Sequence, residues 1–186
     1  MNRSETTRQA SETGGPQHTE LLEEAFSRYQ DELLGMLYYL VGDLEDARDA
    51  FQEAFVKCWR SREKLPEVKN LRAWVFRVAL NAGRDLRQTA WRRRRRPLPA
   101  DDSAGLPSHE APPEAEVARR EQLALVEQAV LALRLEEREV FLLRQNGEMT
   151  YDQIAEATNL PVGTVKTRMR LALEKLRKAF AKSGEE

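Results

Sequence analysis

The amino-acid sequence predicts an all-α protein with two small helical domains joined by a flexible, acidic, proline-rich linker. Apolar residues recur three and four positions apart through residues 20–96 and again through residues 117–182, which is the spacing of an amphipathic helix. Neither segment carries the alternating pattern of a strand. Residues 97–116 are dense in proline and acidic side chains, with no periodicity that could build a core. The polar residues 1–19 predict a disordered tail.

Charged side chains are segregated along the chain, although the formal net charge of the 186 residues is only -1. Residues 1–68 hold 8 Lys/Arg against 14 Asp/Glu, residues 69–96 hold 10 against 1, and residues 97–116 hold 0 against 5. This segregation predicts separate acidic and basic surfaces. No run approaches the roughly 20 apolar residues of a membrane span, and the N-terminus lacks the apolar stretch of a secretion signal. We therefore expect a cytoplasmic protein that does not insert into a membrane.

The first domain is expected to contain three helices. One helix runs from Leu21 to Leu37 and ends before Asp43. Asp43 is a suitable N-cap for a second helix, in which the apolar stripe is most regular. Pro66 then favours a loop, after which Asn70 can cap the third helix. The buried face of the third helix is expected to consist of Leu71, Val75, Val78, Ala79, Ala82 and Leu86.

The third helix carries a row of basic and amide side chains on the side away from this buried face. Spacings of four, three and four residues align the row on one helical face. It consists of Arg77, Asn81, Arg84 and Gln88, with Arg87 beside it. Arginine and amide side chains bind phosphates and exposed base edges, which favours nucleic acid as the ligand. A solvated helix surface would carry the same charges and stays open as the alternative.

The second domain contains a helix-turn-helix pattern. Thr150 and Gln153 have the spacing of a capping box, so a short helix begins there. Residues 159–162 turn the chain, and a longer helix follows. The apolar stripe of that longer helix is Val165, Met169, Ala172, Leu173, Leu176 and Phe180. An upstream helix is expected from about Val117, with a stripe of Leu123, Val126, Ala129, Val130 and Leu133.

The outer face of the longer helix is basic. Lysine and arginine outnumber acidic residues by 7 to 1 in residues 161–182, which attracts DNA whatever its sequence. The side chains placed to meet base edges are Lys166, Thr167, Arg170 and Leu171, and those nearer to the phosphates are Thr164 and Arg168. Basic helical hairpins also occur in proteins that never touch DNA. The combination of capping box, short turn and basic face is what favours a DNA reader.

The sequence offers little for catalysis. His18 and His109 lie in the predicted tail and linker, and Cys58 lies on an apolar stripe where a buried structural cysteine is the usual interpretation. The sequence has no Gly-rich phosphate loop and no metal-ligand spacing. We therefore expect no enzymatic activity, no catalytic residues, no cofactor and no metal.

Three segments together resemble the extracytoplasmic-function (group 4) type of bacterial sigma factor, which keeps only the domains called region 2 and region 4. They are DLEDARDAFQEAFVKCWR at 43–60, NLRAWVFRVALNAGRDLRQ at 70–88 and PVGTVKTR at 161–168. The resemblance implies that residues 20–96 form a region 2-like domain and residues 117–182 a region 4-like domain. It also implies that the chain binds core RNA polymerase and directs promoter-specific transcription initiation, with region 2 at the minus-10 element and region 4 at the minus-35 element.

The same resemblance assigns site residues and partners. Polymerase docking is assigned to Asp46, Asp49, Gln52 and Glu53. The minus-10 element is assigned to the loop of residues 61–70, which includes Lys69 and Asn70 and receives a flipped base, and to Asn81, Arg84, Asp85 and Arg87. Arg77 and Gln88 are added to this set from the basic row described above. The minus-35 element is assigned to Thr164, Lys166, Thr167, Arg168, Arg170 and Leu171. The implied partners are core RNA polymerase, promoter DNA and an anti-sigma protein.

Some features differ from the family pattern. Primary sigma factors have adjacent aromatic side chains that open the duplex. Here Val75, Phe76 and Val78 surround Trp74, which lies at the margin of the apolar stripe, so opening is expected to depend more on the flipped base and on the weakness of the promoter itself. The run Arg92–Arg96 is interpreted as a phosphate-binding end of the minus-10 helix, with a solvated or targeting role as the alternative. The acidic linker is expected to follow a cationic path toward the RNA channel of the polymerase.

A conventional helix-turn-helix regulator is the competing interpretation. In that case residues 20–90 would serve dimerisation or sensing, and the chain would bind an operator tightly without polymerase. A sigma factor would bind DNA weakly on its own and initiate transcription specifically once core enzyme is added.

Overall fold

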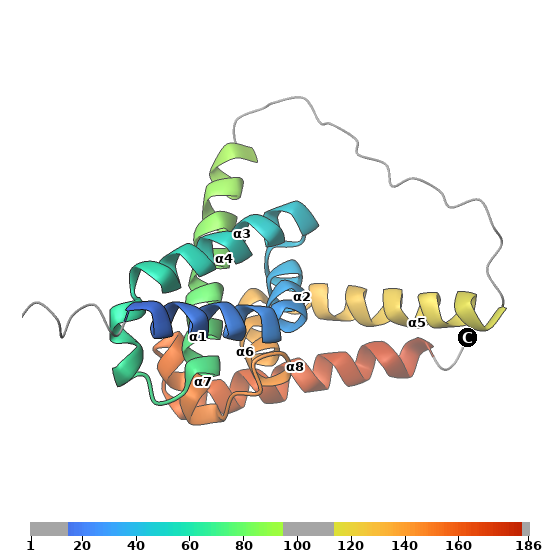
Figure 1. The fold of residues 1–186 in the computed structure, drawn as a ribbon. Helices are drawn as coiled ribbons and strands as arrows, with labels where there is room; N and C mark the ends of the chain where they lie inside the picture. Colours follow the sequence, from blue (N-terminus) through green and yellow to red (C-terminus); the bar gives the residue numbers. More distant parts are fainter. Residues whose placement is uncertain (1–14, 95–113, 184–186) are drawn as a thin grey trace, which may run out of the picture.

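The computed structural model describes residues 15–94 and 114–183, and every regular element in these ranges is a helix (Figure 1). The elements are α1 (Gly15–Arg28), α2 (Gln30–Val41), α3 (Leu44–Arg60), the 3-10 helix η1 (Arg62–Glu67), α4 (Leu71–Arg94), α5 (Glu114–Leu131), α6 (Leu135–Gln145), α7 (Tyr151–Thr158) and α8 (Val162–Ser183). The all-α prediction is confirmed for this part of the chain. None of its helices is long and apolar enough to cross a membrane.

The helix expected from Leu21 to Leu37 is in fact two helices, α1 and α2, so this prediction is wrong. Tyr29 lies between them with φ -105° and ψ 15°, and the helix axis changes direction there (Figure 1). The bend lets α1 pack on α3 and η1 while α2 packs on α3 and α4. A straight helix could not cover both surfaces. One consequence is that Leu21, which lies outside the buried face of α1, is 45% exposed.

Two expected boundaries also change. α1 begins at Gly15, so residues 15–19 of the predicted tail are helical, while residues 1–14 lie outside the described part. α5 begins at Glu114, so the last residues of the predicted linker are helical, while residues 97–113 lie outside the described part.

α3 is capped as the sequence predicts. The backbone N–H of Asp46 donates to Oδ1 of Asp43 over 2.9 Å. The side chains of the fully buried stripe are small, which lets α3 approach α2 and α4 closely: Ala47, Ala50, Ala54 and Cys58. Beside this stripe, the rings of Phe51 and Phe55 pack edge-on against Phe26 of α1, with centroids 5.4 and 5.1 Å apart. The second predicted helix is therefore present with its predicted apolar face.

α4 begins after η1, which replaces the loop expected around Pro66. Its cap is the predicted one, because the N–H of Ala73 donates to Oδ1 of Asn70 over 3.0 Å. The buried face of α4 differs from the predicted one. Val75, Ala79 and Ala82 are buried as predicted, and Phe76 and Leu80 are also fully buried. The other three predicted residues, Leu71, Val78 and Leu86, are only half-buried. The reason is that α4 contacts α2 and α3 on one side and α7 on another. A helix packed between several neighbours buries a wider face than a helix packed against one.

The chain from α5 to α8 forms the C-terminal half. Ala129, Val130 and Leu133 are buried as predicted. Leu123 and Val126, predicted on the same stripe, are 56% and 40% exposed, and Phe180 of α8, another predicted stripe residue, is 39% exposed. The start of α5 and the end of α8 extend away from the other helices (Figure 1), so the described helices cover these apolar side chains only in part. Helical periodicity shows which face is apolar, but it does not show where the neighbouring helices stop.

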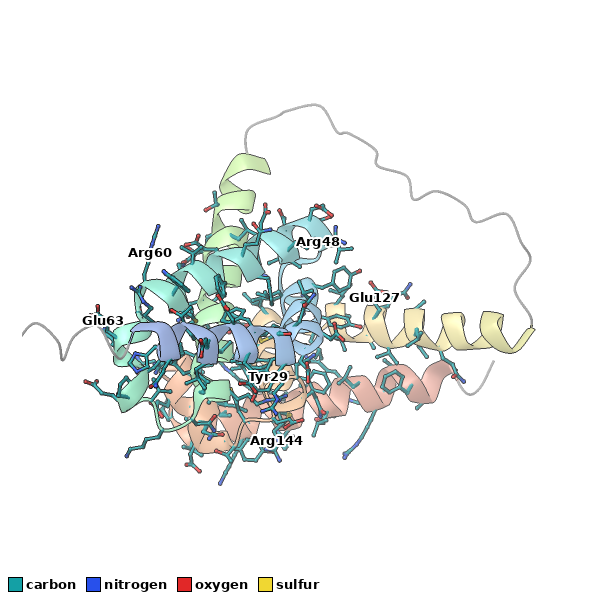
Figure 2. The ribbon with its side chains drawn as sticks, in the orientation of Figure 1. Tyr29, Arg48, Arg60, Glu63, Glu127 and Arg144 are labelled. Carbon is teal, nitrogen blue, oxygen red and sulfur yellow. The ribbon has the colours of Figure 1, made fainter. Side chains whose placement is uncertain are left out.

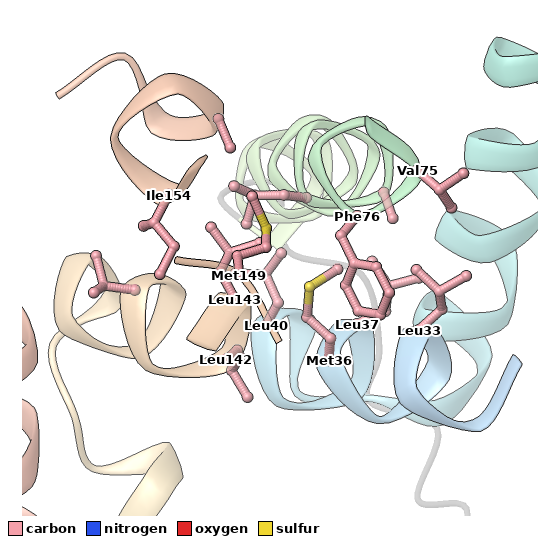
Figure 3. Packing of buried hydrophobic residues seen from close by; sticks show 14 of the residues in the cluster. Leu33, Met36, Leu37, Leu40, Val75, Phe76, Leu142, Leu143, Met149 and Ile154 are labelled. Carbon is pink, nitrogen blue, oxygen red and sulfur yellow. The ribbon is translucent and has the colours of Figure 1, made fainter. Parts of the chain in front are cut away.

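The two halves share one buried apolar cluster. Met36 and Leu40 of α2 and Phe76 of α4 belong to the same cluster as Leu143 of α6 and Met149, which precedes α7. Figure 3 shows these side chains converging between the helices. A Cβ added at Gly147 would lie only 3.3 Å from the ring of Phe76, so the backbone of the C-terminal half passes close to α4 here. Two domains separated by a linker were expected, and in this structure the halves are in direct contact.

Candidate nucleic-acid interface

The helix-turn-helix is built by local hydrogen bonds at α7 and α8. The N–H of Gln153 donates to Oγ1 of Thr150 over 3.3 Å, and the N–H of Thr150 donates to Oε1 of Gln153 over 2.8 Å. This reciprocal pair is the predicted capping box. Asn159 ends α7 in the left-handed conformation, with φ 55° and ψ 45°. α8 then begins at Val162, so a short turn joins the two helices as predicted.

The predicted minus-35 residues lie together on the outer face of α8. Lys166, Thr167 and Arg170 are exposed. The remaining three lie at its margins and are half-buried: Thr164, Arg168 and Leu171. The hydroxyl of Thr167 donates to the carbonyl of Gly163 over 2.9 Å.

One acidic side chain lies among these cations. Glu174 is 3.5 Å from Nη1 of Arg170 and 2.9 Å from Nζ of Lys178. The hydrogen bond from Lys178 lowers the pKa of Glu174, with a further lowering by the charges of Lys178 and Arg170. Glu174 is therefore a carboxylate at neutral pH and partly neutralises the basic face of α8.

The predicted minus-10 row lies along α4, but its members have different surroundings. Asn81, Arg87 and Gln88 are exposed. Arg84 forms two hydrogen bonds with Glu139 of α6, at 2.7 and 2.5 Å, and Arg77 lies 3.7 Å from Glu156 of α7. The expectation that the whole row faces away from buried surfaces is therefore wrong. It fails because α4 packs against the C-terminal half as well as against α2 and α3.

The structure also describes the surroundings of the three remaining residues that were assigned to the minus-10 element. Asp85 accepts a hydrogen bond from Nζ of Lys57 on α3, at 2.8 Å, so it faces α3 and is held by a cation. Lys69 and Asn70 are exposed in the segment that joins η1 to α4. The side chain of Asn70 is already used as the cap of α4.

A hollow of about 450 Å³ lies beside this row, where the C-terminal end of α3 meets η1 and α4. Four cations line it together with the indole of Trp74: Lys57, Arg60, Lys64 and Arg77. Asn81 also lines it, so the row and the hollow are continuous. Arg60 extends outward from the end of α3 (Figure 2). A cationic hollow with an aromatic wall is suited to a nucleotide base and its phosphates.

Lys57 and Arg60 were missed as site residues from the sequence. Both lie in the last turn of α3, where a basic residue is ordinarily explained by its interaction with the helix dipole. They reach the hollow only because α3 crosses α4 near Trp74. The sequence signal for these two residues was the grouping of basic residues at the end of α3 and in η1. Without the fold, this grouping does not show that the side chains meet at one site.

The predicted polymerase-docking residues share the outer side of α3. Asp49, Gln52 and Glu53 are exposed, and Asp46 is half-buried in the first turn. Two exposed apolar side chains flank them, Leu44 at 47% and Val56 at 36%. Leu44 and Val56 were not identified as site residues from the sequence.

The run Arg92–Arg96 is only partly covered by the structure. α4 continues to Arg94, so the backbone of the first arginines is helical. Their side chains, together with residues 95 and 96, lie outside the described part, as does the path of the linker. The interpretations of both segments stay predictions.

Arg72 and Arg138 connect the two halves and were not identified from the sequence. Arg72 donates from Nε to the carbonyl of Gly147 over 3.0 Å and from Nη2 to that of Asn146 over 2.7 Å. Its guanidinium lies 4.6 Å from the ring centre of Tyr29. Arg138 of α6 donates to the carbonyl of Tyr39 of α2 over 2.9 Å, and its burial lowers its pKa. Each arginine lies in one half and donates to backbone carbonyls of the other.

Cys58 is fully buried between helices. Burial raises the pKa of its thiol to about 12, so the nucleophilic thiolate is scarce at neutral pH. Within residues 15–94 and 114–183, no group of three or more His, Cys, Asp or Glu residues is placed to hold a metal ion.

Comparison with known proteins identifies both halves. The model of sigma-70 region 2 matches residues 25–97, and the model of sigma-70 region 4 matches residues 123–176. The RNA polymerase sigma-H factor of Pseudomonas aeruginosa is 31% identical over 161 residues, which cover 82% of each chain. The extracytoplasmic-function RNA polymerase sigma factor SigW of Bacillus subtilis is 29% identical over 161 residues, covering 81% of this chain and 83% of SigW.

Solved structures share the fold. CnrH in complex with the cytosolic domain of CnrY matches with a TM-score of 0.64 at 22% identity, covering 90% of this chain and 95% of that chain. The sigma factor RpoE in complex with the anti-sigma factor NepR from Bartonella quintana matches with a TM-score of 0.65 at 19% identity, covering 86% and 96%.

The helix-turn-helix and the basic row on α4 define a DNA-binding transcription regulator built from two helical regions. More specifically, the chain belongs to the sigma-70 family and is a sigma factor of the extracytoplasmic-function type. It binds core RNA polymerase and directs promoter-specific initiation of transcription. The resemblance noted in the sequence is therefore confirmed.

Proposed function

We propose that α4 and the adjoining cationic hollow bind the minus-10 element, while the outer face of α8 binds the minus-35 element. The convergence of Lys57, Arg60, Lys64 and Arg77 around Trp74 carries this proposal. Four cations beside an indole provide both phosphate contacts and a stacking surface. Asn81, Arg84, Arg87 and Gln88 extend the same surface along α4, and Lys69 and Asn70 lie at its other end.

In this proposal the hollow receives a base that has left the promoter duplex. Flipping a base costs a few kcal/mol of stacking and pairing. Stacking on an aromatic side chain returns ~1–3 kcal/mol per base, and nearby cations add phosphate contacts. Trp74 therefore has a larger part in strand opening than its margin position on the apolar stripe suggested.

Recognition of the minus-35 element is assigned to α8. Lys166 and Arg170 donate to guanine edges or phosphates, Thr167 contacts a base or a phosphate, and the methyl groups of Leu171 contact thymine. Thr164 and Arg168 bind the flanking phosphates. α7 packs against α8, with Ile154 and Val165 fully buried, so α8 can enter the major groove in a fixed orientation.

Polymerase docking is assigned to the outer side of α3. Asp46, Asp49, Gln52 and Glu53 provide hydrogen-bond acceptors and negative charge. Leu44 and Val56 add apolar area at the two ends of this strip, and interfaces of this kind commonly combine an apolar contact with a polar surround. We propose that the regions, residues 20–96 and 117–182, dock separately with residues 97–116 between them.

An anti-sigma protein is a further proposed partner. The similar structures of CnrH and RpoE were each solved with a partner chain, the cytosolic domain of CnrY and the anti-sigma factor NepR. The exposed apolar residues Leu123, Val126 and Phe180 at the ends of α5 and α8 offer one surface for such a partner. We also propose that the chain acts in the cytoplasm with the polymerase and has no catalytic activity or cofactor of its own.

Run-off transcription with purified core polymerase on a promoter library tests the assignment. Trp74→Ala and the pair Arg60→Ala with Lys64→Ala are expected to reduce open-complex formation at least about tenfold, because each loses a stacking or phosphate contact worth ~1–3 kcal/mol. Arg28→Ala is the matched control, since Arg28 is exposed on α1 outside the hollow. Unchanged initiation in the hollow variants would refute the minus-10 assignment.

The competing function is tested in the same samples. A conventional helix-turn-helix regulator would bind a library duplex tightly without polymerase. The sigma-factor assignment expects sequence-specific complexes only after core enzyme is added. Tight specific binding by the free chain would contradict it.

A further inference from the structure

A second hollow, of about 560 Å³, lies between α7 and the segment that joins η1 to α4. Residues between 64 and 77 form one wall, and residues between 149 and 157 form the other. α7 packs against α4, which holds the two walls together. We call this space the α7 hollow. Its volume falls within the range of roughly 300–1,000 Å³ that is usual for small-molecule sites.

The apolar part of the lining is well covered. Met149 is 2% exposed and Ala157 is 8% exposed, and both line the hollow from the C-terminal half. Ala73 and the indole of Trp74 line it from α4 and are half-buried. Buried apolar side chains combined with a few polar groups are the usual composition of a small-molecule site. The indole also offers a surface on which a flat ring can stack.

Two cations in the α7 hollow are available for a ligand. Lys64 and Lys69 are exposed and line the hollow, and neither forms an ion pair with any residue of the described ranges. Arg77, the third cation of the lining, lies 3.7 Å from Glu156 of α7. The free ammonium groups therefore favour an anionic ligand, and a lysine ammonium is a common partner of phosphate groups.

A simple inorganic anion does not fit the rest of the lining. The carboxylates of Glu67 and Glu156 also face the hollow and would repel a phosphate. Carboxylates accept hydrogen bonds from ribose hydroxyls and from the exocyclic amino groups of bases. Gln153 accepts a hydrogen bond from the N–H of Thr150 through its Oε1, which leaves its amide N–H groups for a ligand. The lining therefore suits a molecule with phosphates, hydrogen-bond donors and a flat ring.

We propose that the α7 hollow binds a ribonucleoside polyphosphate. Lys64 and Lys69 bind the phosphates, the indole of Trp74 packs on the base, and Glu156 accepts from the ribose hydroxyls. A ribose contact distinguishes such a ligand from a DNA strand, because deoxyribose lacks the 2′-hydroxyl.

The occupied site has a consequence for DNA binding, which rests on the proposed minus-10 assignment. Lys64, Trp74 and Arg77 line the α7 hollow and also the hollow of about 450 Å³ assigned to the flipped base. A bound nucleotide uses the same cations and the same indole as the promoter strand. The two ligands therefore compete, and the nucleotide reduces the affinity of the chain for single-stranded DNA.

Isothermal titration calorimetry on the full chain tests the site without DNA or polymerase. ATP is expected to bind at a single saturable site and to raise the melting temperature of the chain as its concentration rises. Binding of dATP is expected to be about fivefold weaker, because one hydrogen bond is lost. Tripolyphosphate, which has no base or sugar, is expected to bind about tenfold more weakly than ATP or less well still.

Four variants locate the nucleotide. Lys69→Ala and Ala73→Leu are each expected to weaken ATP binding about tenfold or more, by loss of a phosphate contact and by filling the hollow. Ala124→Leu is the matched control for A73L, because Ala124 is exposed on α5. Arg60→Ala should leave ATP binding unchanged, since Arg60 lines only the hollow assigned to the flipped base. Circular dichroism melting establishes that each variant folds.

Fluorescence anisotropy with a fluorescein-labelled single-stranded DNA of mixed sequence tests the competition. Saturating ATP is expected to weaken DNA binding by the wild-type chain about fivefold or more, and to have no such effect on A73L, which does not bind ATP.

The outcomes separate this inference from the function on which its consequence rests. ATP binding that is lost in K69A and A73L and retained in A124L and R60A supports the site. Absence of ATP binding, equal affinity for dATP or tripolyphosphate, or equal losses in R60A and A73L would refute it. ATP binding that leaves the DNA affinity unchanged refutes the competition alone. The minus-10 assignment has its own test in open-complex formation by Trp74→Ala.

Discussion

The basic rows on α4 and α8 are chemically similar but differ in availability. On α8, Lys166 and Arg170 are exposed, and the acid near them, Glu174, lies on the same helix one turn away. On α4, Arg84 is bound by an acid from the other half of the molecule. The difference teaches that a basic helical face can be a ready DNA reader or a covered one, depending on which helix packs across it.

This contrast has a direct consequence for promoter binding. Lys166 and Arg170 on the outer face of α8 are exposed while the halves are packed. On α4, Asn81, Arg87 and Gln88 are exposed in the same arrangement, whereas Arg84 is bound to Glu139. Changes that loosen the interface between the halves should affect α4 and leave α8 unaffected.

The largest expected effect comes from Phe76, which is fully buried on the side of α4 that faces Gly147. Phe76→Ala should lower the free energy of unfolding by ~3–5 kcal/mol, because it leaves a cavity between the halves. Urea denaturation followed by circular dichroism measures this. Leu171→Ala, a truncation at a half-buried position on α8, should cost clearly less. Equal losses would mean that the region where the halves meet is not a well-packed core.

The next effect concerns the exposed reader. Arg170→Ala and Lys166→Ala should each weaken binding of the holoenzyme to promoter duplexes by roughly 10- to 100-fold, because a good base contact is worth ~1–3 kcal/mol. Electrophoretic mobility shift with core polymerase measures this, with Arg28→Ala as the control. If either substitution lowers affinity equally for all duplexes, that side chain binds phosphate and reads no base.

A smaller effect is expected from the cap of α7. Thr150→Ala removes the acceptor of the Gln153 N–H, which should cost about 1 kcal/mol of stability. Thermal unfolding measures the loss, and Thr150→Ser should restore most of it because serine keeps the hydroxyl. A threonine-to-serine change that behaves like alanine would show that the methyl group, not the cap, matters.

The Tyr38 hydroxyl provides a pH-dependent probe of the interface. It donates to Glu127 of α5, where α5 meets the rest of the molecule (Figure 2). This hydrogen bond raises the pKa of Tyr38 above its ordinary value of 10.0. The protonated form is therefore favoured by folding, so its contribution is complete below pH 10 and is lost as pH rises through the raised pKa.

Tyr38→Phe should accordingly lower stability at neutral pH by about 1 kcal/mol and remove part of the decline at alkaline pH. Chemical denaturation at pH 8 and at about pH 11 compares the variant with the wild type. Tyr39→Phe is the comparison at a tyrosine whose pKa is raised chiefly by burial, so it should also remove part of the alkaline decline, but without loss of the hydrogen bond to Glu127. An alkaline decline that is unchanged in Tyr38→Phe would contradict this assignment.

The smallest expected effect is at Glu174. Glu174→Gln frees Arg170 and Lys178 from their ion pairs, so binding to non-specific duplex DNA should tighten slightly at low salt. The gain should disappear at high salt, because ions screen exposed charges. Fluorescence anisotropy over a salt series measures this, and weaker binding by the variant would refute the role of Glu174 as a neutralising charge.

Several elements of this fold follow from local sequence alone. The caps at Asp43, Asn70 and Thr150 were predicted correctly because a cap involves a side chain and a backbone N–H only three residues away. The bend at Tyr29 was not, because the residues on either side carry one continuous apolar pattern and the bend arises from what α1 and α2 pack against. The exposure of Leu123 was not predicted either, because it also depends on where the neighbouring helices pack.

The sequence by itself determined the helices, their caps, the family and the basic faces of α4 and α8, because these depend on residues within a few turns of one another. Only the tertiary structure decided that Lys57 and Arg60 meet Trp74 in one hollow and that Glu139 covers Arg84. Such contacts join residues separated by many positions, so they depend on how whole helices pack. Helical periodicity fixes the direction of a side chain and leaves its distant partner undetermined.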